Sequence, residues 1–157
     1  MKCDPSKQLL TWNCLYKEMN ELYHHYAAAK GISDSVLWIL YFICLHGGIC
    51  TQRKLCQDSC DPPQTIHSSL KRLEQQGLVT IQLSPGSRKN KEIYLTPAGE
   101  AFAEETVLPL IQAEQHSFTD LSEQEQNQML TLMKKHLGML RQELEQEIQT
   151  QQKGAKP

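Results

Sequence analysis

The side chains with the clearest chemical potential lie on one predicted helix, between Pro62 and Gln76. At about 100° per residue, Ile66, Leu70 and Leu73 share one face of it. The opposite face and its flanks carry Gln64, Thr65, His67, Ser68, Lys71 and Arg72. Amides, hydroxyls and cations can donate hydrogen bonds to base edges and phosphates, whereas an ordinary solvated face more often includes carboxylates. This face is therefore a candidate for contact with nucleic acid.

A second group of cations follows the helix, in a segment that predicts a β-hairpin. Residues 78–83 and 92–95 are rich in the residue types of short strands, and a Pro-Gly pair at residues 85–86 favours a turn between them. The tip is expected to display Arg88, Lys89, Asn90 and Lys91. A basic hairpin in this position can meet phosphates or a minor groove, although a solvent-exposed hairpin with ordinary lysines would have the same composition.

A shorter helix is predicted just before the polar one, over Thr51 to Ser59, with Thr51 as its N-cap. Asp61 is expected to cap the longer helix, which has prolines in its first turn and ends at Gly77. Two short helices joined by a few residues form the helix-turn-helix pattern. The order helix, helix, basic hairpin therefore predicts a winged helix-turn-helix.

A longer amphipathic helix is predicted before this unit. From Trp12 to Tyr26, apolar residues recur at intervals of three and four positions. This helix is expected to end near Gly31, where glycine can adopt the left-handed conformation that often closes a helix. The next segment, residues 33–46, is apolar nearly all round, and its length favours a helix buried on several sides.

Two more helices are predicted after the hairpin. The first begins at Thr96 and reaches about Ser117, with a bend at Pro109. Ser122 and Glu125 form a capping box for the second. Along this last helix runs an apolar seam of Leu130, Met133, Leu137, Leu140, Leu144 and Ile148. The seam needs a partner, which is either the first helix of the same chain or the equivalent helices of a second subunit.

The composition suits a soluble protein of one domain with helical extensions, since 39% of the 157 residues are hydrophobic and 22% are charged. The start lacks the pattern of a signal peptide, and the longest apolar run, Val36 to Leu45, is too short to span a bilayer. We therefore expect a cytoplasmic location. The net charge is −2, yet residues 51–96 carry seven basic and four acidic side chains. This concentration of positive charge suits a nucleic-acid-binding centre.

Three stretches, residues 51–56, 62–79 and 92–99, closely resemble the core of the MarR (multiple-antibiotic-resistance regulator) family. The ending Leu-Thr-x-x-Gly at residues 95–99 is especially typical. The resemblance implies a mainly α fold with a small β-hairpin wing. In that fold, a winged helix-turn-helix DNA-binding domain at residues 33–99 joins a helical dimerisation region.

The resemblance also implies an assembly and a function. Members of this family are homodimers that bind double-stranded DNA at a near-palindromic operator, usually repress transcription, and are released by a small effector. The dimer would use an N-terminal dimerisation helix (1–32) and C-terminal dimerisation helices (100–150), followed by a flexible tail (151–157). The residues expected at the dimer contact are Leu15, Leu130, Met133, Leu137, Leu140 and Leu144.

The sequence departs from the family pattern in two places. The family's wing commonly carries an Asp followed two residues later by an Arg, and these positions are Ser87 and Lys89 here. The Asp normally helps to hold the arginine, and a lysine is a point charge that reads a narrow groove less well. A Lys or Arg often follows the first proline of the recognition helix, and Pro63 stands there instead.

Other chemistries have weaker support in the sequence. Several possible metal ligands are close together, namely Cys44, His46, Cys50, Cys56 and Cys60. None of them forms a paired C-x-x-C set, so we expect no metal and no cofactor, and cysteines that are thiols in a reducing cytosol. The sequence shows no Gly-rich phosphate loop, nucleophile elbow or meaningful carboxylate pair, which argues against an enzyme.

Two alternatives stay open. Peroxide-sensing relatives carry a reactive cysteine in the first helix, so Cys14 is a candidate for redox-controlled release of DNA, and its alternative is an idle thiol in an amphipathic helix. The histidine pair of the same helix, His24-His25, is not one of these alternatives, because it is typical of a polar helix end rather than of a catalytic site. A winged helix that binds only protein is the other alternative, because a fold does not determine a function.

Overall fold

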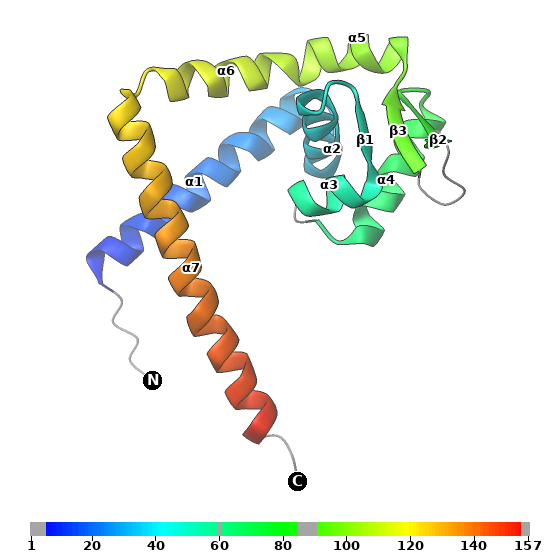
Figure 1. Cartoon of the computed structure of the whole chain (residues 1–157). Helices are drawn as coiled ribbons and strands as arrows, with labels where there is room; N and C mark the ends of the chain where they lie inside the picture. Colours follow the sequence, from blue (N-terminus) through cyan, green and yellow to red (C-terminus); the bar gives the residue numbers. More distant parts are fainter. Residues whose placement is uncertain (1–5, 60, 85–90, 155–157) are drawn as a thin grey trace. The chain divides into compact units, whose positions relative to one another are not determined.

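The structure is a computed structural model that describes residues 6–59, 61–84 and 91–154. Its elements (Figure 1) are α1 (Lys7–Ala29), α2 (Asp34–Leu45), β1 (Ile49–Thr51), α3 (Gln52–Asp58), α4 (Pro63–Gln75), β2 (Val79–Leu83), β3 (Lys91–Leu95), α5 (Pro97–Thr106), α6 (Leu108–Thr119) and α7 (Glu123–Gly154). The predicted mainly α fold with a small β component is confirmed. The chain divides into two compact units, Met1–Ile111 and Gln112–Pro157.

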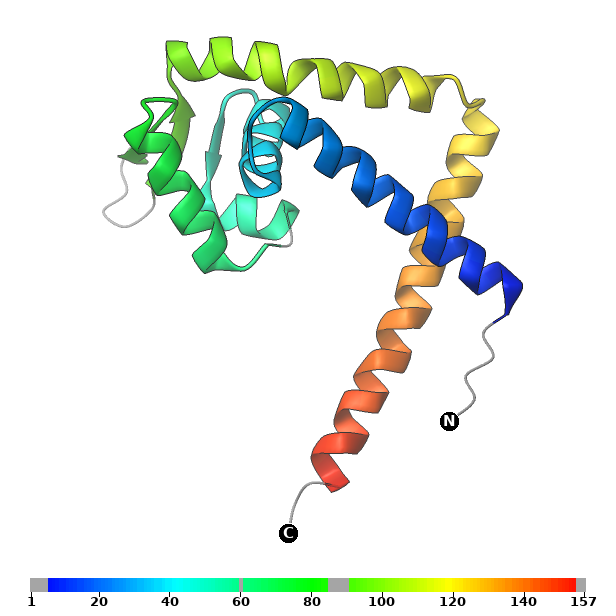
Figure 2. The same ribbon diagram turned by 180° about the vertical axis from the view of Figure 1, so that it is seen from behind.

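Helix α2 lies at the centre of the first unit. Its sequence is almost entirely apolar, and Leu37, Ile39, Leu40 and Ile43 are fully buried. Helices α1, α3, α4 and α5 pack against it, as do strands β1 and β3. In the view from behind (Figure 2), α5 lies above α2 and α3 lies below it. The prediction of a buried helix over residues 33–46 is confirmed, with Ser33 as its N-cap.

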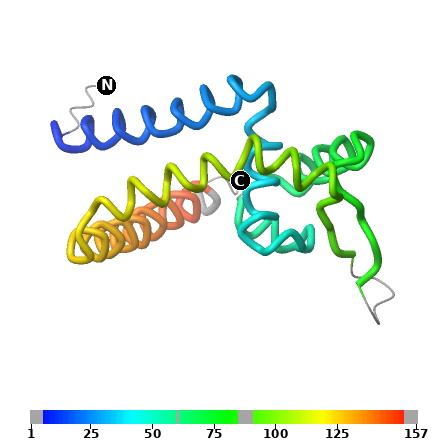
Figure 3. The backbone as a smooth tube through the Cα atoms, turned by 90° about the horizontal axis from the view of Figure 1, so that it is seen from above, coloured from blue at the N-terminus to red at the C-terminus, as the bar shows by residue number. Residues whose placement is uncertain are grey.

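Three short strands form one antiparallel sheet in the order β1-β3-β2. Ile93 of the central strand pairs with Cys50 on one side and with Ile81 on the other. The hairpin of β2 and β3 was predicted, and it projects from the helices of the first unit (Figure 3). Strand β1 was not predicted, because three residues between a glycine pair and a helix carry no usable alternation.

The helix ends follow the sequence signals, with one exception. Gly31 closes α1 with a left-handed φ of 70°, and the Lys54 N–H donates to the capping Thr51 Oγ1 at 3.2 Å. The prediction that Asp61 caps α4 is wrong, because Pro62 is the N-cap and no side chain caps the helix. The following proline holds Pro62 extended, so the N-cap lies one residue after the expected one and the helix begins at Pro63.

Two boundaries in the C-terminal half also differ from prediction. The expected helix with a bend at Pro109 is two helices, α5 and α6, which separate at Val107. Pro109 lies in the first turn of α6, where its missing N–H leaves no helical hydrogen bond unmade. Helix α7 continues to Gly154, so it extends beyond residue 150, where the tail was expected to begin.

The second unit consists of the last part of α6 and the whole of α7. The predicted capping box is confirmed, since the Ser122 N–H donates to Glu125 Oε2 at 2.8 Å and the Glu125 N–H donates to Ser122 Oγ at 3.4 Å. The side-chain amide of Gln126 donates to the carbonyls of Phe118 and Leu121, both at 2.9 Å. These bonds fix the turn between the two helices.

Apolar side chains are exposed on both long helices. On α7, the exposed apolar side chains include the whole predicted seam, Leu130, Met133, Leu137, Leu140, Leu144 and Ile148, and also Leu132 and Met139. On α1, Leu15 is 58% exposed, and Tyr16, Met19 and Leu22 are exposed beside it. In the described part of the chain, no single helix is long and apolar enough to cross a membrane. Helices α1 and α2 meet the criteria of length and apolar composition only when they are taken together, and they are bent by 92° relative to each other.

Helix α5 begins very close to the chain that leaves α4. The Thr96 N–H donates to the Leu78 carbonyl at 3.1 Å, and the Thr96 hydroxyl donates to the Gly77 carbonyl at 2.6 Å. The same hydroxyl caps α5 by accepting the Gly99 N–H at 3.0 Å. A Cβ atom at Gly99 would lie 1.9 Å from the Leu78 carbonyl oxygen. The glycine of the Leu-Thr-x-x-Gly motif is therefore required by this close approach.

We expect Gly99→Ala to lower the free energy of unfolding by about 3 kcal/mol, because backbone must move to admit the methyl group. The matched control is Gly138→Ala in α7, where a Cβ would meet nothing within 4 Å. There alanine is expected to stabilise the helix by about 0.5–1 kcal/mol. Urea unfolding followed by circular dichroism, at one fixed protein concentration, measures both. An equal effect of the two substitutions would contradict the close-packing argument.

Candidate nucleic-acid interface

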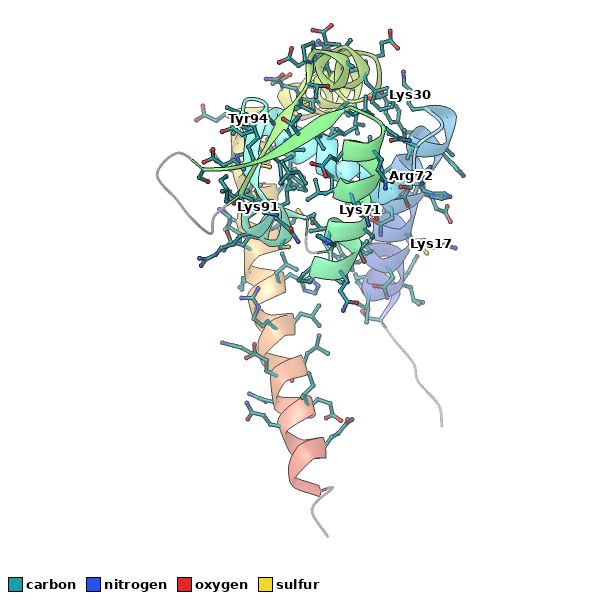
Figure 4. The ribbon with its side chains drawn as sticks, turned by 90° about the vertical axis from the view of Figure 1, so that its right-hand side faces the viewer. Lys17, Lys30, Lys71, Arg72, Lys91 and Tyr94 are labelled. Carbon is teal, nitrogen blue, oxygen red and sulfur yellow. The ribbon has the colours of Figure 1, made fainter. Side chains whose placement is uncertain are left out.

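Helix α4 has two distinct faces. Ile66, Leu70 and Leu73 are fully buried, as predicted. On the other side, the α4 polar face is exposed at Gln64, His67, Ser68, Lys71 and Arg72 and half-buried at Thr65. Figure 4 shows α4 in front, with Lys71 and Arg72 on it. The predicted inward and outward faces are thus confirmed as geometry, because the burial follows the helical period.

The start of α4 adds backbone donors to this face. No side chain caps the 13-residue helix, so the N–H groups of Gln64 and Thr65 have no acceptor within the helix. Amides at the positive end of a helix bind phosphate oxygens readily. The hydroxyl of Ser68 donates to the Thr65 carbonyl at 2.9 Å, so its lone pairs are turned outward as acceptors.

A charged cluster around Asp58 ties α3 to the end of α2. His46 Nε2 lies 2.7 Å from one carboxylate oxygen of Asp58, and Lys54 Nζ donates to the other at 3.0 Å. The hydrogen bonds from His46 and then from Lys54 lower the pKa of Asp58. Because α3 packs on α4, the cluster helps to set the position of the α4 polar face. Sequence analysis missed this pairing, since no local pattern joins His46 to Asp58.

The hairpin supplies one described cation, Lys91, which is exposed at the start of β3 (Figure 4). Further along β3, the Tyr94 hydroxyl donates to the Glu92 carboxylate at 2.5 Å. This hydrogen bond raises the pKa of Tyr94. The other predicted wing residues lie outside the described residues, namely Arg88, Lys89 and Asn90, together with the departure at Ser87.

The cysteines of α2, β1 and α3 contribute to packing. Cys50 is buried, and Cys44 and Cys56 are half-buried. Burial, with a contribution from the Asp58 carboxylate, raises the pKa of the Cys50 thiol to about 12. Among the described residues, no three His, Cys, Asp or Glu side chains converge as metal ligands. Cys60 lies outside those residues.

Two further candidates from the sequence lie on α1. Cys14 is exposed, and its redox role stays a prediction. His24 Nδ1 lies 3.1 and 3.0 Å from the two carboxylate oxygens of Asp34. It therefore links the last part of α1 to the start of α2, as befits a polar helix end.

Comparison with known proteins identifies the fold. Residues 30–89 match the model of the MarR family. The chain is similar to a MarR family regulator from Neisseria meningitidis, with a TM-score of 0.73 and 18% identity over 90% of this chain and 99% of that one. A comparison with curated proteins gave no significant match. The predicted mainly α winged-helix fold is confirmed, and the family match covers residues 51–89 of the stretch 51–99 on which the resemblance was based.

Two other solved structures of this fold are informative. The S. aureus MepR–DNA complex matches with a TM-score of 0.65 and 21% identity, over 87% of this chain and 99% of that one. BpsR of Bordetella bronchiseptica, whose DNA binding is regulated by 6-hydroxynicotinic acid, matches with a TM-score of 0.55 and 21% identity, over 80% of this chain and 98% of that one.

The Asp58 cluster makes the stability of the protein dependent on pH. Since the folded state lowers the pKa of Asp58, the carboxylate contributes stability above its unfolded pKa of about 3.9, and that contribution is lost as pH falls through the folded pKa. We expect Asp58→Asn to be less stable than the unsubstituted chain at pH 7. This difference should shrink as pH falls below about 4, which urea unfolding across pH would measure.

The control for this prediction is Asp61→Asn, which removes a carboxylate that has no salt-bridge partner in the described part of the chain. It should change stability at pH 7 less than Asp58→Asn does. A stability gap between Asp58→Asn and the unsubstituted chain that stayed constant down to pH 3 would contradict the cluster's role.

Proposed function

We propose that this chain, which has the winged-helix fold of the MarR family and matches its model over residues 30–89, is a transcription regulator that binds double-stranded DNA. The observation that carries the proposal is the α4 polar face, where amides, hydroxyls and cations stand exposed on a helix whose other side is fully buried. A helix of this kind fits the major groove. MepR, a relative in fold, has been solved with DNA.

The side chains of the interface divide by chemistry. Gln64 and Ser68 can make hydrogen bonds to base edges, with Thr65 and His67 beside them at the margin. Lys71 and Arg72 are suited to phosphates, as is Lys91 at the start of β3. In this proposal the remaining wing residues meet the adjacent minor groove, namely Arg88, Lys89 and Asn90.

We infer further that the regulator is a homodimer. The exposed apolar seam of α7 and the exposed side chains around Leu15 of α1 support this, since monomeric soluble proteins rarely leave large apolar patches in water. A two-fold dimer would present two α4 helices to a near-palindromic operator. Repression and release by a small effector complete the proposal, and the ligand-regulated DNA binding of BpsR supports them. In this role the chain acts in the cytoplasm and has no enzymatic activity.

The test of DNA binding is fluorescence anisotropy of the reduced protein with its own upstream region and with unrelated DNA, at several salt concentrations. We expect sequence-preferring binding that weakens steeply with salt. Lys71→Gln should weaken binding to all DNA about equally and reduce the salt slope by about 1. Gln64→Ala should cost about 1–3 kcal/mol on the preferred sequence and relax the preference.

The matched control for Lys71→Gln is Lys134→Gln, which removes the same charge from an exposed position on α7, outside the proposed interface. It should leave affinity and salt slope unchanged. Weak binding to every fragment, independent of salt, would contradict the proposal and favour a winged helix that binds only protein.

The dimer is tested by a substitution in the apolar seam. Leu140→Glu should weaken dimerisation by more than about 100-fold, or about 3 kcal/mol, because a charge would enter the apolar contact. Gln142→Glu introduces the same charge on the other side of α7 and should leave the dimer intact. Multi-angle light scattering over a range of protein concentrations measures both. Dimers that persist equally in the two variants would show that the seam is not the interface.

A further inference from the structure

The junction between α5 and α6 separates two backbone carbonyls from their usual helical donors. In a continuous helix the Glu105 carbonyl would accept the N–H of residue 109, but that residue is Pro109, which has no N–H. The Thr106 carbonyl belongs to the last residue of α5, so its helical donor would lie beyond the break, in α6. Thr106 and Val107 are buried, and a buried carbonyl needs a partner from the protein where water has little access.

Two side chains from the end of α1 supply donors to these carbonyls. The Tyr26 hydroxyl donates to the Thr106 carbonyl at 3.0 Å, and Lys30 Nζ donates to the Glu105 carbonyl at 2.9 Å. Figure 1 shows this end of α1 beside the place where α5 and α6 meet. Because the two residues are four positions apart, they lie on one face of α1. Lys30 Nζ also lies 5.6 Å from the centre of the Tyr26 ring, so each side chain helps to hold the other.

The chemistry of both donors suits the end of a helix. A cation is favoured beside the last carbonyls of a helix, and Glu105 lies in the last turn of α5. Tyr26 packs against the core, and burial raises the pKa of its phenol. The hydroxyl therefore keeps its proton at neutral pH and remains a donor.

The junction joins the packed body that presents α4 to the chain that leads into the second unit. Helix α5 packs against α2 and β3, and α4 packs against α2 as well. Helix α6 begins at Leu108 and continues beyond Ile111, the last residue of the first unit. The conformation of the junction therefore determines in which direction the chain leaves the body that carries the α4 polar face.

We propose that Tyr26 and Lys30 are positioning residues that fix the α5–α6 junction and thereby determine which spacing of operator half-sites the dimer accepts. The hold on the junction depends on the first unit alone. The effect on spacing rests on the proposed function, because two α4 helices must be held at one separation to read two half-sites. One base pair changes the separation of the half-sites by about 3.4 Å and their relative rotation by about 35°. A junction held by defined hydrogen bonds should distinguish such spacings, and a loosened junction should accept several.

The hold on the junction is tested by hydrogen exchange and mass spectrometry of the full-length protein without DNA. Tyr26→Phe keeps the ring and removes the hydroxyl. The amides that report on the junction are those of Val107 and Ile111, which donate across it at 2.8 and 3.0 Å. We expect them to exchange about 10-fold or more faster in Tyr26→Phe, since a buried acceptor that loses its donor is costly. Lys30→Met should have a smaller effect in the same direction, because Glu105 is exposed and water can replace the ammonium there.

The matched controls are Tyr16→Phe and Lys17→Met, which remove the same groups from exposed positions several turns earlier on α1. They should leave exchange at the junction unchanged. The buried amides of α2 are the internal reference, because a general loss of stability would speed their exchange as well. Circular dichroism melting verifies that each variant folds. Junction amides that keep their original rate in Tyr26→Phe, or that speed up no more than those of α2, would overturn the proposal.

The effect on spacing is measured by fluorescence anisotropy with four DNA duplexes. These carry the sequence that the protein protects in its own upstream region, the same sequence with one base pair added or removed at its centre, and one half-site alone. We expect the unsubstituted chain to bind the native spacing at least about 10-fold more tightly than either altered spacing. The double variant Tyr26→Phe/Lys30→Met should retain a preference of about 3-fold or less and bind the half-site with unchanged affinity, because its α4 polar face is intact. The double control Tyr16→Phe/Lys17→Met should keep the full preference.

The outcomes distinguish failure of this proposal from failure of the proposed function. If no duplex is bound, the proposed function fails and the role in spacing fails with it, while the hold on the junction is decided by hydrogen exchange. If DNA is bound and the double variant Tyr26→Phe/Lys30→Met keeps the full spacing preference, the proposal is overturned and the proposed function stands. A loss of affinity that is equal for the half-site and for every spacing would show that the two residues only stabilise the fold, which also overturns the proposal.

Discussion

The burial of α2 is the constraint on which the rest of the first unit depends. Four of its side chains are fully buried, and burying each stabilises the fold by about 1.5–3 kcal/mol relative to leaving it exposed. The neighbours α1, α3, α4 and α5 all pack against it. The α4 polar face is therefore presented by a helix whose inner side is fixed in a close-packed core. The Asp58 cluster helps to fix the orientation of α3 against α2, because its hydrogen bonds join the ends of the two helices at defined atoms.

Much of this arrangement could be predicted from the sequence, because it follows from short-range periodicity. The inner residues Ile66, Leu70 and Leu73 and the outward residue Lys71 were assigned correctly, since a helix with one apolar side has little choice of orientation. The chemistry of a hydroxyl likewise predicted the cap at Thr51. These features depend on residues that are four or fewer positions apart.

The features that escaped prediction depend on distant residues or on competition between neighbours. Strand β1 exists because β3, more than forty residues later, pairs with it. The hydrogen bond from Lys30 Nζ to the Glu105 carbonyl joins residues 75 positions apart, and no sequence pattern relates them. The wrong prediction of Asp61 as the N-cap has another cause. Acidic residues are favoured at N-caps, but the conformation that the adjacent prolines impose places the cap at Pro62. Neither periodicity nor packing determines whether α4 contacts DNA, because that depends on which molecule the protein binds.

The second unit raises a different physical question, because it has little core of its own. Helix α7 has 32 residues, and none of its described side chains is buried. Long helices in water owe most of their stability to tertiary packing of an apolar face. An apolar seam that is exposed along such a helix therefore favours association, and the exposed stripe around Leu15 on α1 has the same consequence.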